Sequence, residues 1–588
     1  MKTRKLILVA VSALVSLWSA HSGAQTKPLP DLCAVAPGAQ PSLPARLLTG
    51  MGTTNMPVTT KSDEARAFFN QGMSQVHSFW FTESERSFLQ ALTLDPDFAM
   101  AYWGIAVSAA GDYRPAFQLM RNPNEGGRRG AAPESTEIQR TTNGAAIDGE
   151  IRAREYVEKA MALRDKVTER ERLYIESQWA RRDPAHGGDA KKKDAAYIEG
   201  LRKLGAAYPD DIEAVLILGL ATLNGFDPVT KEPRAGTTEA LALLEGVVAK
   251  DDNQFGAHHY LIHGWEGSKT PERAWHACQR YPELVPNIPH ALHMPGHIYA
   301  QSDRIDDAVA AFGAASENEL GYLAADVLYA NGHHGHNEHF LIQALNLDGR
   351  FRDSMDHVKH LLSYKETPRE REGLNQRSVY RQGLFALIKT LTRFERWDLV
   401  LDGTTIPVYD KPEQNGWRHW ATGLALARRG EIENARQALS DLEKDYDAAK
   451  GNREPLGIAV AELKGTIESL AGNPGKGYAH FREAADREAA QLYTEPPAYP
   501  RPVVEALGSV ALALKDYATA EKAYREALER EPGGGRAYFG LAGALSGLGR
   551  VDEAQKMIAR GTAAWDKADA DLPQMQKLVP TAASAKGN

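Results

Sequence analysis

The feature that most constrains this fold is a fixed step between two pairs of histidines. His259 and His263 are four residues apart, and His293 and His297 repeat that spacing 34 residues later. Residues of one kind that recur at a fixed step of 20 to 50 residues indicate a repeat architecture, in which similar units stack on their neighbours. The 588-residue chain is therefore expected to form one long array.

A step of 34 residues is typical of the tetratricopeptide repeat (TPR), a pair of helices A and B with small or apolar residues at fixed positions and often a closing proline. The pattern is clearest near the end of the chain. Positions 7, 8, 20, 24, 27 and 32 there are Leu507, Gly508, Ala520, Tyr524, Ala527 and Pro532. No segment shows the alternation typical of strands. The sequence predicts an all-α fold, a TPR-like α-solenoid superhelix.

Eleven of the eighteen histidines lie between Asn253 and Arg350. Residues four apart share one face of a helix, and positions 2, 5, 9 and 12 of helix A face the concave groove of a TPR array. With a 12-residue insertion before His336, three neighbouring A helices present histidines at positions 2, 5 and 9: His290 and His336, then His259, His293 and His339, then His263 and His297. Glu266 is at position 12 of the first of these helices.

These seven histidines are candidate metal ligands, because neutral imidazole binds Zn, Cu, Fe and Ni and two histidines at i and i+4 can hold one ion. They could form one site or a dinuclear one. Glu266 is the candidate catalytic residue, as a base, a ligand beside His263 or a hydrogen-bonding support. Two alternatives stay open: a metal-free pocket in which protonated histidines bind a carboxylate, and plain packing. His258, His276 and His334 lie off this face, and we interpret them as packing residues.

These segments also resemble a known family. Exported bacterial TPR proteins carry the histidine motifs HYxIHxxE, HMPxHIY and HNxHFL, and this chain has HYLIHGWE, HMPGHIY and HNEHFL, with LDPDFAMAYWGIA before them and EPPAYPRP after them. The resemblance spans roughly Ala67 to Leu548 and implies a TPR fold without naming a reaction. The site residues that it implies are His259, His263, Glu266, His293, His297, His336, Asn337 and His339. The first repeat departs from the family, because it reads SFWFTESE where relatives often have Phe-Asn-His-x-Glu.

The N-terminus has the features of a secretory signal. Lys2, Arg4 and Lys5 precede the apolar run Leu6 to Leu17, and a small-residue cleavage site ends at Ala24. Such a signal is removed on export, so we expect a periplasmic or secreted protein. No later stretch is apolar for 18 residues, which predicts no membrane span. The net charge of −8, without a basic block, argues against nucleic-acid binding.

The chain is expected to divide by repeat pattern. The predicted parts are a signal peptide (1–24), an extended arm (25–62), N-terminal repeats with a loop insertion at 121–148 (63–250), histidine-bearing repeats (251–365), C-terminal repeats (366–572) and a disordered tail (573–588). Cys278 falls on a buried helix-B position and is interpreted as a free thiol, although pairing with Cys33 is possible. The expected partner is a small molecule or a peptide in the groove, and a protein partner is also compatible. The turn that contains Glu495 and Arg501 is interpreted as a rigid connector.

Overall fold

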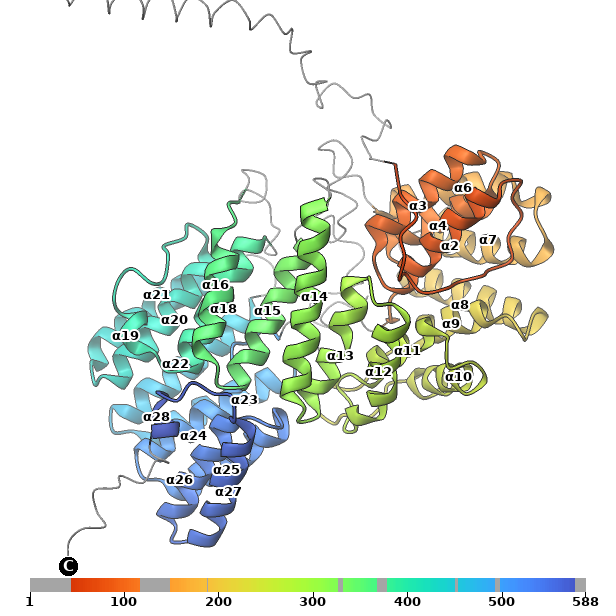
Figure 1. Ribbon diagram of the computed structural model, residues 1–588. Coiled ribbons are helices and arrows are strands. Elements are labelled where there is room, and N and C mark those ends of the chain that lie inside the picture. The colour runs from red at the N-terminus through yellow and green to blue at the C-terminus, as the bar shows by residue number, and fades with distance from the viewer. Residues whose placement is uncertain are drawn as a thin grey trace, which may run out of the picture.

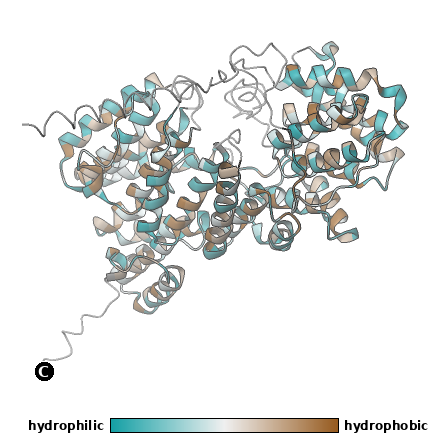
Figure 2. Ribbon diagram, turned by 45° about the horizontal axis from the view of Figure 1, so that its top comes forward, coloured by the Kyte–Doolittle hydropathy of each residue, from teal (hydrophilic) through white to brown (hydrophobic). Residues whose placement is uncertain are grey.

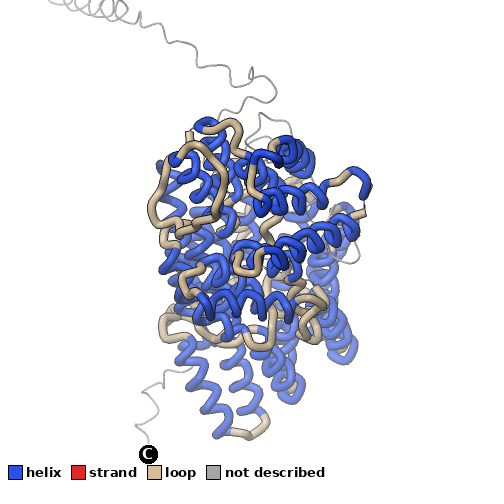
Figure 3. Tube along the Cα trace, turned by 90° about the vertical axis from the view of Figure 1, so that its right-hand side faces the viewer, coloured by secondary structure: helices blue, strands red, loops and turns tan. Residues whose placement is uncertain are grey.

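The computed structural model describes residues 44–116, 149–187, 189–325, 332–366, 378–449, 453–491 and 497–576. In these ranges the fold is all-α, as predicted, with 25 α-helices and a single isolated bridge between Phe226 and Pro233 (Figure 3). The predicted signal peptide (1–24) and the loop insertion (121–148) lie outside the described residues. None of the helices in the described ranges has the length and apolar character that a membrane span requires.

The helices follow one another in antiparallel pairs along a curved array (Figure 1). The N-terminal part contains α2 (Asp63–His77), α3 (Phe81–Leu94), α4 (Ala99–Ala110), α6 (Gly149–Ala162), α7 (Glu169–Arg182), α8 (Ala190–Ala207), α9 (Ile212–Thr222) and α10 (Thr237–Lys250), with the short 3-10 helices η3 (Arg164–Lys166) and η4 (Pro184–His186). The histidine-bearing part contains α11 (Phe255–Trp265), η5 (Pro271–Ala274), α12 (Trp275–Leu284), α13 (Pro289–Gln301), α14 (Ile305–Ala325), α15 (Gly332–Leu347) and α16 (Phe351–Ser363).

The C-terminal part continues the same arrangement. It contains α18 (Val379–Arg393), α19 (Trp397–Val400), α20 (Pro412–Arg428), α21 (Ile432–Ala448), α22 (Glu454–Leu470), α23 (Pro474–Ala489), α24 (Val503–Ala513), α25 (Tyr517–Arg530), α26 (Gly535–Gly547), α27 (Val551–Ala564) and α28 (Pro573–Gln576). Figure 2 shows hydrophobic and hydrophilic residues interleaved along these helices. This is the pattern of amphipathic helices that bury one side against their neighbours.

Close packing of glycine against an aromatic ring joins successive repeats. The ring of Phe88 on α3 lies against Gly72 of its own repeat and Gly104 of the next, and a Cβ at either glycine would lie 2.6 Å from that ring. Near the C-terminus, a Cβ at Gly540 would lie 2.2 Å from the ring of Tyr524. Because protein interiors are close-packed, the small residue of helix A makes room for the large residue of helix B. This is the physical basis of the sequence pattern.

The helix-free segment 44–62 connects distant repeats. The backbone N–H of Asn287 donates to the carbonyl of Gly50 (3.1 Å), and its side-chain amide donates to the carbonyl of Thr49 (2.9 Å). At the other end, the backbone N–H of Thr59 donates to Glu171 on α7 (2.6 Å). The segment therefore links the N-terminal repeats to the turn that precedes α13.

Two large clusters of buried apolar residues meet at α15. The first extends from Met51 to Leu345 and the second from Ile342 to Ala554. Leu345 and Ile342 are both on α15, so this helix contributes to both cores. The helix that carries His336 and His339 is thus packed from two sides.

The C-terminal end of the array returns to the turn between α15 and α16. The indole Nε1 of Trp565 donates to the carbonyl of Leu347 (2.7 Å), and the backbone N–H of Asp569 donates to the carbonyl of Gly349 (3.1 Å). Asp569 also accepts from the backbone N–H of Arg352 (2.9 Å). We call this contact the C-terminal closure.

Cys278 is buried on α12, where burial raises the pKa of its thiol. Its position agrees with the predicted buried helix-B site. Cys33 lies outside the described residues.

Candidate metal centre

Six of the seven predicted histidines come together in two groups on the A helices α11, α13 and α15. Within each group the candidate ligand atoms lie within 4.8 Å of one another. We call the first group triad 1; it consists of His259, His263 and His290. We call the second group triad 2; it consists of His293, His297 and His336.

Both triads are built by the same rule. Each takes repeat positions 5 and 9 from one A helix and position 2 from the next A helix along the array. His259 and His290 are 31 residues apart in the sequence, whereas His293 and His336 are 43 residues apart. The excess of 12 residues equals the insertion predicted before His336. The array therefore reaches the same three-histidine arrangement twice.

In triad 1 a backbone carbonyl fixes the protonated nitrogen of one ring. Nδ1 of His259 lies 2.5 Å from the carbonyl oxygen of His77. Because a carbonyl can only accept, this Nδ1 carries the hydrogen and leaves a lone pair on Nε2. Nε2 of His290 lies 3.1 Å from that atom. The Nε2 atoms of His259 and His290 thus face each other.

Triad 2 has the same internal contact between two Nε2 atoms. Those of His293 and His297, one helical turn apart on α13, are separated by 2.7 Å. The ring of His336 lies beside that of His293, with 4.9 Å between the ring centroids. Nδ1 of His297 lies 3.3 Å from a carboxylate oxygen of Glu266.

Glu266 connects the two triads. It follows the last residue of α11, and its side chain is fully buried. One carboxylate oxygen accepts from Nδ1 of His263 (2.9 Å), and the other faces Nδ1 of His297 (3.3 Å). Carboxylates that accept from the non-coordinating nitrogen of metal-binding histidines fix the tautomer and the ring orientation. The position of Glu266 fits this supporting role.

The imidazoles of His259, His290 and His293 are neutral at neutral pH. Burial lowers the pKa of His259, His290 and His293 well below the usual value, and the neighbouring imidazoles lower it further. Burial disfavours the charged form of any base. The neutral ring is the form that binds a metal, whereas a carboxylate-binding pocket of protonated histidines would need the charged form.

His333, which is not among the seven predicted ligands, lies at the more exposed side of the site. The side chain of His333 is 26% exposed, and its ring centroid lies 5.9 Å from that of His290 and 5.7 Å from that of His336. Its Nδ1 lies 3.0 and 3.1 Å from the two carboxylate oxygens of Glu319 on α14. Asn337 also donates to Glu319 (2.5 Å). His333 is adjacent to both triads.

The turn between α2 and α3 also contributes to the site, although its sequence differs from the family pattern. Besides the carbonyl of His77, it supplies the ring of Phe79, whose centroid lies 4.4 Å from that of His259 and 5.2 Å from that of His263. Phe79 has a φ of 54°, a left-handed conformation that is unusual for a bulky residue and is often found at functional sites. The first repeat thus covers one side of triad 1.

His77 is held by a separate network of side chains. Its Nδ1 lies 2.7 Å from the hydroxyl of Tyr260, and its Nε2 lies 2.8 Å from Glu213. Tyr113 also donates to Glu213 (2.6 Å). These contacts fix the carbonyl that orients His259.

His339, the seventh predicted ligand, does not join either triad. It is only 2% exposed, and its ring lies 5.8 Å from that of Phe385 on α18. Neither ring nitrogen has a hydrogen-bond partner among the described residues. Burial, and then the charge of Lys389, lower its pKa well below the usual value. This leaves a neutral and unsatisfied imidazole on the same helix as His336 of triad 2.

The histidines that the register placed elsewhere have other partners. His276 and His258 both contact Asp252, through the carboxylate (2.6 Å) and the carbonyl oxygen (2.9 Å), respectively. Arg280 pairs with the same Asp252 carboxylate (3.0 Å). His334 faces His360 on α16. His258 and His334 are buried, whereas His276 is exposed. Asp252, His258 and His276 also form a group whose candidate ligand atoms lie within 4.8 Å of one another.

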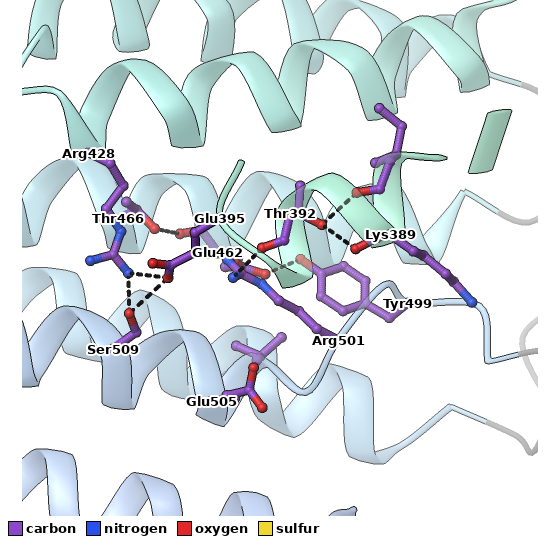
Figure 4. Close-up of polar contacts among 12 residues, drawn as sticks. Lys389, Thr392, Glu395, Arg428, Glu462, Thr466, Tyr499, Arg501, Glu505 and Ser509 are labelled. Atoms are coloured by element: carbon purple, nitrogen blue, oxygen red, sulfur yellow. Dashed lines mark hydrogen bonds and ion pairs between the residues drawn. The ribbon is translucent and has the colours of Figure 1, made fainter. Parts of the chain in front are cut away.

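The EPPAYPRP turn reaches the interior of the C-terminal repeats (Figure 4). Arg501 pairs with Glu462 on α22 (2.8 Å), and Tyr499 donates to the same carboxylate. Lys389 on α18 donates to the carbonyl of Pro497 (3.0 Å). The turn therefore does more than connect two helices, because it fills the space between α18, α22 and α24 with polar contacts.

Comparisons with known proteins found one repeat family and several solved structures of low similarity. Residues 511–579 match the tetratricopeptide repeat family. No curated protein matches the sequence. Among solved structures, human IFIT1 in a dimer with m7Gppp-AAAA shares 13% identity, and the match covers 87% of this chain and 92% of that one with a TM-score of 0.32. Yeast Tom70 shares 11% identity over 88% and 93% of the two chains, with a TM-score of 0.27. Ypp1 shares 10% identity over 86% and 88%, with a TM-score of 0.41.

Together with the helical pairs, the tetratricopeptide repeat match over residues 511–579 confirms the predicted fold class, a TPR-like α-solenoid.

Proposed function

We propose that this chain is an exported TPR superhelix that binds transition metal in its concave groove, at triads 1 and 2, and acts there on a small molecule. The repeat fold also suits a protein-binding scaffold. The histidine arrangement is what favours a metal.

The observation that supports this proposal most strongly is the duplicated triad with a shared carboxylate. Packing alone does not require each of two neighbouring repeats to bring three imidazoles together from the same repeat positions. Metal coordination accounts for the convergence of the three rings in each triad. Glu266 accepts from Nδ1 of His263 and lies 3.3 Å from Nδ1 of His297, a position suited to the support of both ligands.

The donor set suggests the class of metal and of chemistry. Imidazole suits Zn, Cu, Fe and Ni. A metal held by three histidines keeps a fourth position for water or substrate, and it lowers the pKa of bound water toward neutrality or polarises a substrate oxygen. In this proposal the protein holds the rings in place: the carbonyl of His77 orients His259, and Glu266 orients His263 and His297.

The burial of the triads suggests the size of the ligand. His259 and His293 are fully buried, whereas His290, His333 and His336 are partly exposed. A ligand would therefore approach from the side of α15, past the His333 ring. This favours a small molecule, or the end of a peptide, over a flat protein surface.

Metal analysis of the mature protein tests the proposal. The protein is produced with its own signal sequence, purified without a histidine tag, and assayed for Zn, Cu, Fe and Ni before and after reconstitution. We expect up to two equivalents of one metal, and we expect the purified N-terminus to follow Ala24. Less than about a tenth of an equivalent of every metal after reconstitution would rule out the metal centre.

The metal-free alternative makes a different prediction. If protonated histidines gripped a carboxylate, binding of a peptide C-terminus would weaken as the pH rose past about 6.5. Peptide capture at pH 5.5 and pH 8 by EDTA-treated protein separates the two functions. We expect no such pH-dependent capture, because burial lowers the pKa of His259, His290 and His293 well below the usual value.

A further inference from the structure

His339 and Lys389 form an unusual buried pair. His339 is 2% exposed and Lys389 is 3% exposed. Both lie next to Phe385, whose ring centroid is 5.8 Å from that of His339 and 4.8 Å from Nζ of Lys389. They belong to neighbouring A helices, α15 and α18, as do the members of each triad.

Among the described residues, the ammonium group of Lys389 has no direct ion-pair partner. Its Nζ donates to the carbonyl of Pro497 (3.0 Å) and lies 3.5 Å from the side-chain oxygen of Gln343. Within the described ranges no carboxylate lies within ion-pair distance of this Nζ. Buried charges in proteins are normally paired. Burial accordingly lowers the pKa of Lys389 to about 7.

The acidic residues nearby are engaged with arginines. Arg393, one turn further along α18, lies 2.6 Å from Glu531 and 3.2 Å from Glu505. Glu462 is paired with Arg501. In Figure 4 the Nζ of Lys389 points away from the labelled carboxylates. The charge of Glu531 offsets part of the effect of burial on the pKa of Lys389. Among the described residues, however, no carboxylate of this network contacts Nζ directly.

We propose that Lys389, His339 and Gln343 form a binding site for a small carboxylate. One oxygen of the carboxylate would accept from Nζ of Lys389 and the other from a ring N–H of His339, while the Gln343 amide supplies a further polar contact. Such a ligand would give the ammonium group an anionic acceptor and would give one of the two unsatisfied ring nitrogens of His339 a hydrogen-bond partner. This site lies beyond the metal centre, and its occupation does not depend on a bound metal.

Charge balance favours a carboxylate over a phosphate. The site offers a single cation, because Arg393 is already paired with two carboxylates. A monoanion neutralises Lys389, whereas a phosphate dianion would leave a buried net negative charge. A carboxylate also has two oxygens, which matches two main donors from different helices.

The position of the site connects it with the proposed function. Gln343 is at repeat position 9 of α15 and His339 is at position 5, so they correspond to the paired histidines of each triad. His336, a member of triad 2, precedes His339 by three residues on the same helix. A substrate that carries a carboxylate could thus be held at Lys389 while another part of it faces triad 2.

The test uses full-length mature protein treated with EDTA, so that failure of metal binding cannot affect the result. Sodium acetate, sodium phosphate and sodium chloride at equal ionic strength are compared by thermal midpoint and by NMR line broadening of 13C-labelled acetate. The variants are Lys389→Met, Lys389→Arg and His339→Gln. The matched control is Lys464→Met, which changes a partly exposed lysine that is paired with Glu443 on α21.

We expect acetate to raise the midpoint of the wild type and of the Lys464→Met control. Acetate affinity should fall at least ten-fold in Lys389→Met and in His339→Gln, and Lys389→Arg should retain part of it. Without acetate, Lys389→Met should be at least as stable as the wild type, because it removes a buried charge that has no direct ion-pair partner among the described residues. If Lys389→Met does not fold, the acetate affinities of His339→Gln and Lys389→Arg are compared with that of the wild type instead.

Three results would overturn the proposal. The first is acetate binding that is absent from the wild type, or that is unchanged in both Lys389→Met and His339→Gln. The second is phosphate binding more than ten-fold tighter than acetate. The third is acetate binding to Glu495→Gln but not to the wild type, which would mean that the chain supplies its own carboxylate; Glu495 lies outside the described residues.

Discussion

His263 and His297 lie on different helices, yet their Nδ1 atoms face the two oxygens of one carboxylate. His263 is on α11 and His297 is on α13, and Glu266 lies between them at 2.9 and 3.3 Å. Each histidine belongs to a different triad. Glu266 therefore links the two triads, and a substitution at Glu266 should alter the orientation of a histidine in each of them.

Glu266→Gln tests this coupling. An amide has one acceptor oxygen and one donor NH2 group, so it can accept from only one of the two Nδ1–H groups and opposes the other. We expect metal affinity to fall about ten- to a hundred-fold in at least one triad, as is usual when the support of a ligating histidine is lost. Competition with a chromophoric chelator measures this. Glu283→Gln, at an exposed glutamate, should leave the titration unchanged, and an unchanged Glu266→Gln titration would contradict the supporting role.

Alanine substitutions should show which histidines share an ion. His259→Ala and His263→Ala should each weaken metal binding at triad 1 at least ten-fold, which is about 1.4 kcal/mol. The double variant should lose little more than the worse single variant, because both remove the same coordination sphere. Combining His263→Ala with His293→Ala should instead remove a second equivalent. Calorimetric titration decides between these outcomes, and the control is His419→Ala, at a ring that pairs with Asp445 on α21.

The metal-free protein should lose stability in weak acid. The pKa of His259, His293 and His339 is lower in the folded protein than the unfolded value of about 6.5, and burial is the main cause. The unfolded chain therefore binds more protons below pH 6.5, so the stability is complete above that pH and is lost as the pH falls below it. Each histidine contributes a slope of about 1.4 kcal/mol per pH unit. Urea unfolding in EDTA between pH 7.5 and 5 measures the slope.

His293→Gln should reduce that slope by about one proton, whereas His276→Gln, at an exposed ring, should not. A flat stability profile for the wild type would show that the buried rings do not stay neutral.

Two glycines provide a matched test of packing at triad 2. A Cβ at Gly296, between His293 and His297, would lie 2.5 Å from the ring of Phe312, whereas a Cβ at Gly313 on α14 meets nothing within 4 Å. Gly296→Ala should cost about 1–3 kcal/mol through overpacking and weaken metal binding, because α13 must shift. Gly313→Ala should be neutral or stabilise by up to about 1 kcal/mol. Thermal unfolding of both variants checks this, and equal midpoints would argue against tight packing at α13.

The sequence register predicted the helices and the faces on which the histidines lie, because both follow from the local helical period. The fixed step brought His259 and His263 to the groove, and His293 and His297 after them. What the register did not predict is that position 2 of the next helix completes each triad. That depends on the stagger between neighbouring A helices, which is a tertiary property. For the same reason His339 lies beside Phe385 on α18 and not with the other histidines.

Other parts of the site left no periodic signal. Phe79 reaches triad 1 from a left-handed turn between two helices, and no repeat position specifies such a turn. Glu319 is on a B helix, whose residues normally pack away from the groove. It approaches His333 near the C-terminal end of α14, which at 21 residues is longer than its neighbours α13 and α15. The length of that helix is a feature of one repeat, so a pattern shared by all repeats cannot reveal it.

The C-terminal closure has a consequence for how the molecule comes apart. In an open array each repeat touches only its neighbours, so terminal repeats can fray independently of the middle. Here the indole of Trp565 is tied to the carbonyl of Leu347, 218 residues earlier in the chain. The repeats between these two residues therefore form a closed ring of contacts. The last helices cannot unfold without breaking a contact at the end of α15. Because α15 also carries His336, disorder that begins at the C-terminus would be transmitted to triad 2.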